Sequence, residues 1–213
     1  MAEFLDRNGE PLLEGLIDHL VLTGIAVGVG LILSLGLALV AHSRPRLAPL
    51  VTGSTGLLYT IPSLALFAFL VPFTGLSLLT AEVGLVGYTL LILVRNILAG
   101  LDSVPAEIRE AADGMGHTAG QRLLRVDLPL AVPLILAGLR IATVTTVGLV
   151  TVTALIGEGG LGQVMLRAFN LQNWGLVYAS VGLMVALAIF LDLAILALQR
   201  AVTPWSRAGG RAA

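Results

Sequence analysis

Five stretches of predominantly apolar residues, each about 20 residues or longer, run along the chain. They cover residues 17–41, 49–71, 83–101, 128–156 and 175–198. About 20 apolar residues are enough for a helix to cross a bilayer, and none of the stretches shows the ten-residue alternation of a membrane-spanning β-barrel. The pattern predicts an all-α integral membrane protein with five transmembrane helices.

Composition strengthens this prediction and excludes several classes of function. The chain is 57% hydrophobic, has a mean hydropathy of +0.97, and carries only 12% charged residues, about half the share in a soluble domain. It contains no cysteine and no lysine, which excludes disulfide scaffolds, thiolate zinc sites, conventional P-loop ATPases and Schiff-base enzymes. The three histidines lie far apart, and no His, Asp and Ser cluster suggests an enzyme. We therefore expect no catalytic residue, metal or cofactor on this chain.

The arginines predict the orientation of the spans. Cytoplasmic loops of membrane proteins carry an excess of basic residues. With five spans, one side of the membrane receives only Arg7 and Arg167, whereas the other side receives Arg44, Arg46, Arg95, Arg109, Arg122, Arg125, Arg200, Arg207 and Arg211. We expect an extracytoplasmic N-terminal segment (residues 1–16), a membrane domain (17–200) and a cytoplasmic tail (201–213). Trp174 and Tyr178 fit an outer aromatic belt, and Trp205 an inner one.

A segment of about 25 residues (102–127) between the third and fourth spans is too long for a simple turn. Pro105 suits the first turn of a helix, Gly116 is available to stop it, and Thr118 with Gln121 forms a capping box for a second short helix. The first helix has one apolar stripe, formed by Ile108, Ala111, Ala112 and Met115. The segment is therefore predicted to be structured on the cytoplasmic side.

The spacing in this segment resembles the EAA loop of ATP-binding cassette (ABC) importer permeases. Glu110-Ala111-Ala112 is followed by three residues, Gly116, nine residues, Val126, one residue and Leu128-Pro129. Only Val126 departs from the family pattern, where isoleucine is usual. The chain thus resembles the type I ABC transporter permease family over residues 17–200. The resemblance implies a cytoplasmic coupling helix between helices three and four that docks on a separate ATPase through Ile108, Glu110, Ala111, Ala112, Met115 and Gly116.

Residue chemistry also favours partner docking over the alternative of a helix lying on the membrane surface. Two alanines let a helix seat closely in a groove, and Glu110 suits a basic residue of the partner. A surface-bound membrane helix has a cationic polar face, whereas this segment carries Glu107, Glu110 and Asp113 against Arg109.

Further strings, at residues 114–118, 126–130, 136–140 and 155–162, resemble the glycine betaine/carnitine/choline permeases. This resemblance implies a non-enzymatic permease subunit of the bacterial plasma membrane that carries a quaternary-amine osmoprotectant. Its partners would be an ATPase dimer that holds ATP and Mg, a second permease subunit, identical or different, and an extracytoplasmic substrate-binding protein. Methionine permeases share a related glycine-rich tail and are the alternative. An ion-coupled carrier or channel would need carboxylates along its path, for which only Glu82 and Asp192 are candidates.

Other polar residues within the spans have two interpretations. Arg140 and Asp192 lie at similar depth on antiparallel helices, so we expect them to form a buried charge pair, because an unpaired charge there costs several kcal/mol; an anion site is the alternative. Residues 60–62 predict a break in the second span at Pro62. Tyr59, Thr60, Pro62, Thr143 and Thr146 are candidates for the translocation path, against ordinary packing or hydrogen bonding to the helix backbone.

Glycines form two further patterns. Residues 157–162 formally match GxGxxG, but the preceding membrane helix argues against a dinucleotide site and favours a tight outer turn. Gly24 and Gly28 form a GxxxG pattern, which predicts close helix packing within or between subunits.

Overall fold

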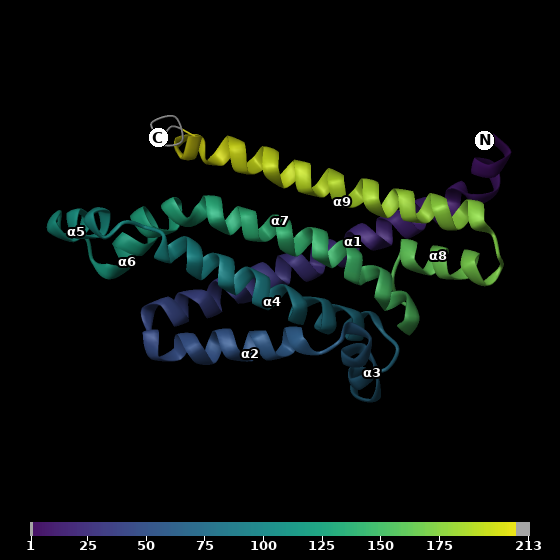
Figure 1. The fold of residues 1–213 in the computed structure, drawn as a ribbon, viewed down its shortest axis with the longest axis horizontal. Coiled ribbons are helices and arrows are strands. Elements are labelled where there is room, and N and C mark those ends of the chain that lie inside the picture. Colours follow the sequence, from purple (N-terminus) through teal and green to yellow (C-terminus); the bar gives the residue numbers. More distant parts are fainter. Residues whose placement is uncertain (1, 208–213) are drawn as a thin grey trace.

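The computed structural model describes the backbone of residues 2–207 and the side chains of residues 8–205. Described residues fold into helices without any strand (Figure 1). The helices are α1 (Ala2–Ser43), α2 (Ala48–Thr60), α3 (Ser63–Thr74), α4 (Leu78–Asp102), α5 (Ala106–Gly114), α6 (Ala119–Arg122), α7 (Leu128–Thr153), α8 (Leu161–Asn170) and α9 (Trp174–Val202). Short helical turns occupy Pro45–Leu47, Leu123–Asp127, Ala154–Ile156 and Pro204–Arg207.

Four continuous helical segments in the described chain are long and apolar enough to cross a membrane: Asn8–Ser43, Leu78–Asp102, Ala119–Ile156 and Trp174–Val202. The remaining predicted span is bent by 96° between Pro45–Thr60 and Ser63–Thr74. Ile61 and Pro62 are extended at the bend, with ψ angles of 126° and 134°, and proline cannot donate a helical hydrogen bond. The predicted break is confirmed, and the number of spans is four or five according to whether the bent pair counts as one.

The structure extends the first span and adds a helix that the sequence analysis missed. α1 begins at Ala2 and continues through Pro11, so the N-terminal segment is a helical extension of the first span. α8 follows the glycine-rich turn and buries Leu161, Gly162 and Ala168 against α1, α7 and α9. The side chains of Arg7 and Arg207 and the whole of residues 208–213, including Arg211, lie outside the described residues.

The core lies where α4 packs on α7 and α1 crosses both helices. Glycines allow the closest approaches: a Cβ on Gly100 would lie 3.0 Å from the carbonyl oxygen of Ala131, and one on Gly138 would overlap the side chain of Asn96. Gly24 and Gly28 have no atom within 4 Å of a built Cβ and line a groove between α1, α7 and α9. Close packing at this pattern is therefore not found within the described chain, and packing between subunits stays a prediction.

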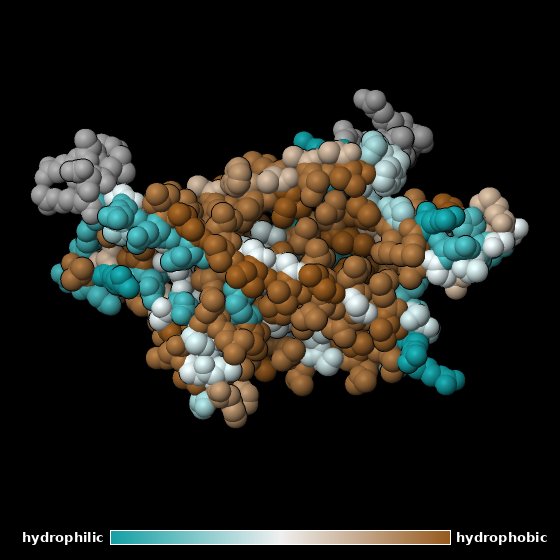
Figure 2. Space-filling view, turned by 180° about the vertical axis from the view of Figure 1, so that it is seen from behind, coloured by the Kyte–Doolittle hydropathy of each residue, from teal (hydrophilic) through white to brown (hydrophobic). Residues whose placement is uncertain are grey.

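The outer surface is apolar along the middle of the molecule and polar at its two ends (Figure 2). Trp174 and Tyr178 are exposed at the α8–α9 end, and Trp205 is exposed at the opposite end. The short helices α5 and α6 lie at the same end as the last turn of α9, and the start of α1 lies at the other end (Figure 1). An apolar girdle between two polar ends is the surface that a bilayer requires.

Candidate functional site

Helix α5 begins and ends where the sequence predicts. Pro105 is its N-cap, and Glu107 lies in the first turn, where a negative charge interacts favourably with the positive end of the helix dipole. Gly116 has a φ of +85°, and its backbone N–H donates to the carbonyl of Asp113 at 2.9 Å. Such a left-handed residue after the last turn is typical of a helix stop. Both the short helix and its glycine stop are confirmed.

The apolar stripe of α5 divides between an inner and an outer side. Ala112 is buried against its own chain, whereas Ile108 and Met115 are 40% and 72% exposed. Ala111, Glu110 and Gly116 are exposed as well. Ala112, which was expected on the docking surface, therefore packs inside its own chain instead. The exposed side presents two large apolar side chains beside a carboxylate that has no ion-pair partner among the described residues.

A buried carboxylate just before the start of α7 links α5 to the membrane helices. Asp127 is 1% exposed, and its oxygens lie 3.5 Å from Nε of Arg109 and 3.6 Å from Nε of Arg122. Arg122 also donates to Asp113 at 2.6 Å, and Arg109 donates to the carbonyl of Leu101 at the end of α4. This network links α4, α5, α6 and α7. No sequence pattern predicts this network; the one signal is a single acid in the mostly apolar stretch 123–130.

Helix α6 joins the loop rigidly to α7. The predicted capping box is present: Thr118 N–H donates to Gln121 Oε1 at 2.9 Å, and Gln121 N–H donates to Thr118 Oγ1 at 3.3 Å. From there a π-helical turn, Leu123–Asp127, leads into α7 without interruption. The helix is therefore continuous from α6 into the membrane, and residues 115–118 connect its start to α5.

Arg140 and Asp192 form a bidentate ion pair between α7 and α9. Nε and Nη2 of Arg140 donate to the two carboxylate oxygens at 2.8 and 2.7 Å. The pair is not deeply buried, because the two side chains are 28% and 30% exposed. They open into a hollow of about 400 Å³ on the surface of the chain, whose other lining residues are Ala137, Ile141, Val144 and Thr145.

The candidate path residues separate into two groups. Around the bend, Tyr59 is 42% exposed and packs edge-on against Tyr88 at 5.8 Å, whose hydroxyl donates to the carbonyl of Ile61. Thr60 donates to the carbonyl of Leu57 at 2.7 Å, and Pro62 is the N-cap of α3. The second group, on α7, is buried and bonded to its own helix backbone: Thr143 and Thr146 donate to the carbonyls four residues before them at 2.8 Å.

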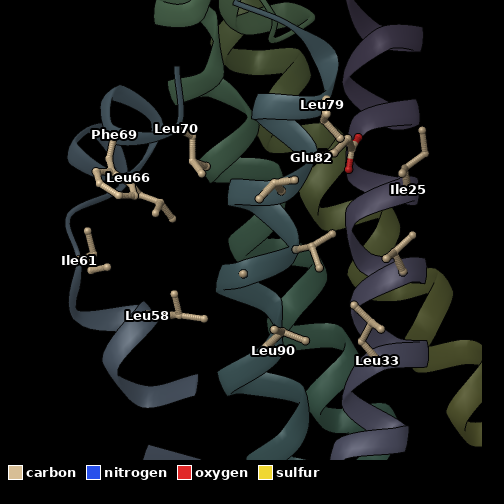
Figure 3. Close-up of a pocket in the computed structure, with 14 residues that line it drawn as sticks. Ile25, Leu33, Leu58, Ile61, Leu66, Phe69, Leu70, Leu79, Glu82 and Leu90 are labelled. Carbon is tan, nitrogen blue, oxygen red and sulfur yellow. The ribbon is translucent and has the colours of Figure 1, made fainter. Parts of the chain in front are cut away.

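A larger hollow of about 640 Å³ lies between α1, the α2–α3 bend and α4 (Figure 3). Its walls are almost wholly aliphatic and aromatic, with Leu58, Ile61 and Phe69 on one side. Glu82 projects from α4 toward α1 near Ile25 (Figure 3), and both of its carboxylate oxygens are buried without a hydrogen-bond partner in the described structure. This hollow offers one carboxylate in an apolar setting.

The glycine-rich segment forms the tight turn that the sequence predicts. Gly157, Gly159 and Gly160 have φ angles of +89°, +143° and +48°, which favour glycine. A Cβ on Gly160 would lie 2.5 Å from the backbone nitrogen of His19, and the ring of this histidine lies 2.9 Å from the carbonyl of Val147. Helix α7 and a helical turn precede the segment where a dinucleotide site would need a strand, so the glycines serve backbone packing.

Comparison with known proteins places the chain among transport permeases. The sequence model of the family described as binding-protein-dependent transport system inner membrane component matches residues 26–207. The chain is 38% identical to the osmoprotectant import permease protein OsmW of Salmonella typhimurium over 192 residues, covering 88% of this chain and 89% of the relative. It is 33% identical to the glycine betaine/carnitine/choline transport system permease protein OpuCB of Bacillus subtilis over 204 residues, covering 96% and 94%.

A solved structure has the same fold. The inward-facing MetNI methionine ABC transporter superposes with a TM-score of 0.85 over 92% of this chain and 98% of that chain, at 24% sequence identity. This similarity shows that the described helices adopt the fold of an ABC importer permease.

Proposed function

Because this chain belongs to the family of binding-protein-dependent transport system inner membrane components, we propose that it forms the translocation path of an ATP-driven importer for a quaternary-amine osmoprotectant. The observation that carries the substrate class is the identity, over most of the chain, to permeases named for osmoprotectant and for glycine betaine, carnitine and choline transport. The chain is a multi-pass inner-membrane protein. On this proposal ATP is hydrolysed by a separate subunit, and a separate protein delivers the substrate.

The exposed side of α5 is the proposed contact with the ATPase. Ile108 and Met115 would enter apolar pockets of the partner, and Glu110 would meet a basic residue at the rim. Their exposure supports this role, as does the lack of an ion-pair partner for Glu110 among the described residues. Closure of the ATPase dimer would then move α5 as a rigid body, and the Asp127 network would pass the movement to α4 and α7.

The proposed orientation places α5 and the end of α9 in the cytoplasm and the start of α1 outside. These elements lie at opposite ends of the molecule (Figure 1), and the arginine-rich loops lie at the same end as α5. A second permease subunit, identical or different, would complete the path. It would cover part of the apolar exterior, of which α9 is the least buried span.

A methionine-type importer is the second candidate, because the glycine-rich segment at residues 155–162 also resembles methionine permeases. The fold shared with the MetNI structure, at 24% identity, carries no substrate information. Transport assays distinguish the two directly.

The proposal is tested by ATP-dependent uptake into proteoliposomes that contain this chain, its ATPase and its binding protein. Labelled glycine betaine and labelled methionine are compared for the wild type and for Glu110→Arg. Betaine uptake that falls at least about tenfold in the variant is expected, since a charge reversal at a docking rim opposes association. Glu14→Arg makes the same charge change at an exposed position at the other end of the molecule and serves as the control.

Methionine uptake instead of betaine uptake would show that the protein is part of an importer but that methionine is its substrate. Uptake without ATP would contradict the importer and favour an ion-coupled carrier. Full uptake by Glu110→Arg would contradict the proposed role of α5.

A further inference from the structure

The hollow at the Arg140–Asp192 pair lies near the middle of the membrane. Arg140 is twelve residues from the start of α7, and Asp192 is ten residues from the end of α9. At 1.5 Å per residue, these positions are about 18 and 15 Å from the ends that lie beside α5. Since α7 is about 39 Å long by the same rule, the ion pair is close to its midpoint.

An ion pair with almost a third of its surface open at this depth does not suit a lipid-facing position. Charged side chains within spans almost always face the bundle interior or a water-filled cavity. The side chains of Arg140 and Asp192 are 28% and 30% exposed. They lie on the surface side of α7, next to the exposed side chains of Ile141 and Val144. This side of α7 therefore faces a polar space or another subunit in the assembled transporter.

The hollow also contains a hydroxyl that is free to bind a ligand. Among the threonines of α7, residues 143, 146 and 153 donate to backbone carbonyls of their own helix, and Thr151 donates to Met184. Thr145 lines the hollow and has no hydrogen bond from its hydroxyl within the described structure. A guanidinium, a carboxylate, a free hydroxyl and aliphatic walls thus share one space.

We propose that this hollow is a transient binding site for a zwitterion with a quaternary ammonium group and a carboxylate. The ligand carboxylate binds the guanidinium of Arg140 and the hydroxyl of Thr145. Its ammonium group lies beside the carboxylate of Asp192, with the methyl groups against Ile141 and Val144. This inference rests on the proposed function and adds the residues that select the substrate's charge.

The resting ion pair makes the site reversible. When a zwitterion enters, each protein charge exchanges its partner for the opposite charge of the ligand, so neither is left unpaired in a setting of low dielectric. When the ligand leaves, the bidentate pair forms again. Such an exchange gives weak binding, which a site on a transport path needs for release. The hollow at Glu82 lacks a cationic group and cannot recognise the carboxylate of a zwitterion.

The test measures saturation-transfer NMR from the purified permease–ATPase complex to the trimethylammonium protons of glycine betaine, a zwitterion, and choline, a cation. Arg140→Gln should reduce the betaine signal about tenfold, the loss expected for a hydrogen bond to a charged group. It should not reduce the choline signal, because choline has no carboxylate for Arg140 to bind and Asp192 is then free to attract the ammonium group. Asp192→Asn should reduce both signals. A purely structural pair would change both ligands alike in both variants.

Thr145→Val and Thr145→Ser test the site without breaking the ion pair. The valine variant has nearly the same shape and should weaken betaine about threefold, the loss expected for one neutral hydrogen bond, without affecting choline. The serine variant should bind as the wild type does. Thermal unfolding of each complex shows whether a variant is folded.

Wild-type uptake, measured after the same complex is placed in proteoliposomes with its binding protein, separates the two hypotheses. Uptake of neither compound would contradict the proposed function. Betaine uptake with no wild-type saturation transfer, or with signals that none of these variants changes, would overturn the site and leave the importer in place.

Discussion

Replacing Gly138 by alanine should weaken the contact between α4 and α7, the central helix pair of the fold. A Cβ built at this position lies 2.7 Å from Cγ of Asn96 and closer still to its Cβ. Ordinary Cβ contacts begin at 3.4 Å, so the two helices must separate by at least about 0.7 Å, because the clash involves the root of the Asn96 side chain rather than its flexible end.

The expected cost follows from overpacking of this kind, which destabilises by about 1–3 kcal/mol. For a chain of this length each kcal/mol corresponds to about 2–4 °C, so Tm should fall by about 2–12 °C. Thermal unfolding of the detergent-solubilised permease, followed by far-UV circular dichroism, measures the change. Gly148→Ala is the matched control on the same helix, since nothing lies within 4 Å of its built Cβ.

A second pair of variants shows whether the clash with Asn96, rather than another effect of the added methyl group, lowers the Tm. Asn96→Gly removes all three Asn96 atoms that the new Cβ meets, so adding Gly138→Ala to this variant should cost nearly nothing. If Gly138→Ala unfolds at the same temperature as Gly148→Ala, the two helices do not approach each other as closely at Gly138 as the structure shows. If the loss persists on the Asn96→Gly background, the clash is not its cause.

Three further predictions concern other contacts. Gly84→Ala should lower Tm by a similar margin, because its Cβ would lie 2.9 Å from Cδ1 of the buried Phe67, whereas Gly87→Ala, with open space around it, should not; equal values would contradict the docking of α3. Asp127→Asn should lower uptake more than ATP hydrolysis, since two arginines lose their buried counter-charge; an unchanged ratio of transport to hydrolysis would remove the proposed link. Gly160→Ala should reduce the yield of folded, monodisperse protein, because its φ of +48° and its backbone neighbours exclude a side chain; a normal yield would show that the turn relaxes.

Features that depend on neighbours along the chain could be predicted from the sequence. The break at Pro62 follows from proline geometry, the stop at Gly116 from a left-handed residue, and the α6 cap from the spacing of Thr118 and Gln121. Each involves residues a few positions apart, so the pattern contains the whole interaction. The exposed side of α5 was also predictable, except that periodicity alone did not show which of its residues turns inward.

Features that depend on tertiary position could not be predicted in this way. The network at Asp127 joins residues from four helices, and no spacing rule brings them together. The GxxxG pattern at Gly24 suggested close packing, but Gly30, which meets Thr89, is the described glycine of α1 that lies closest to α4. The sequence shows several threonines on α7, but only the structure shows that Thr143 and Thr146 bond to their own helix whereas Thr145 faces the hollow.

The unbroken helix from Ala119 to Ile156 has a mechanical consequence. Its 38 residues make a rod about 57 Å long, with the α5 loop at one end and the glycine-rich turn at the other. A tilt of about 10° around its midpoint would move the two ends by about 5 Å in opposite directions. A movement that narrows the translocation path on one side of the membrane would therefore widen it on the other side. Arg140 is close to this fulcrum, where the displacement is smallest. A ligand held there would stay nearly still while access to it changes sides.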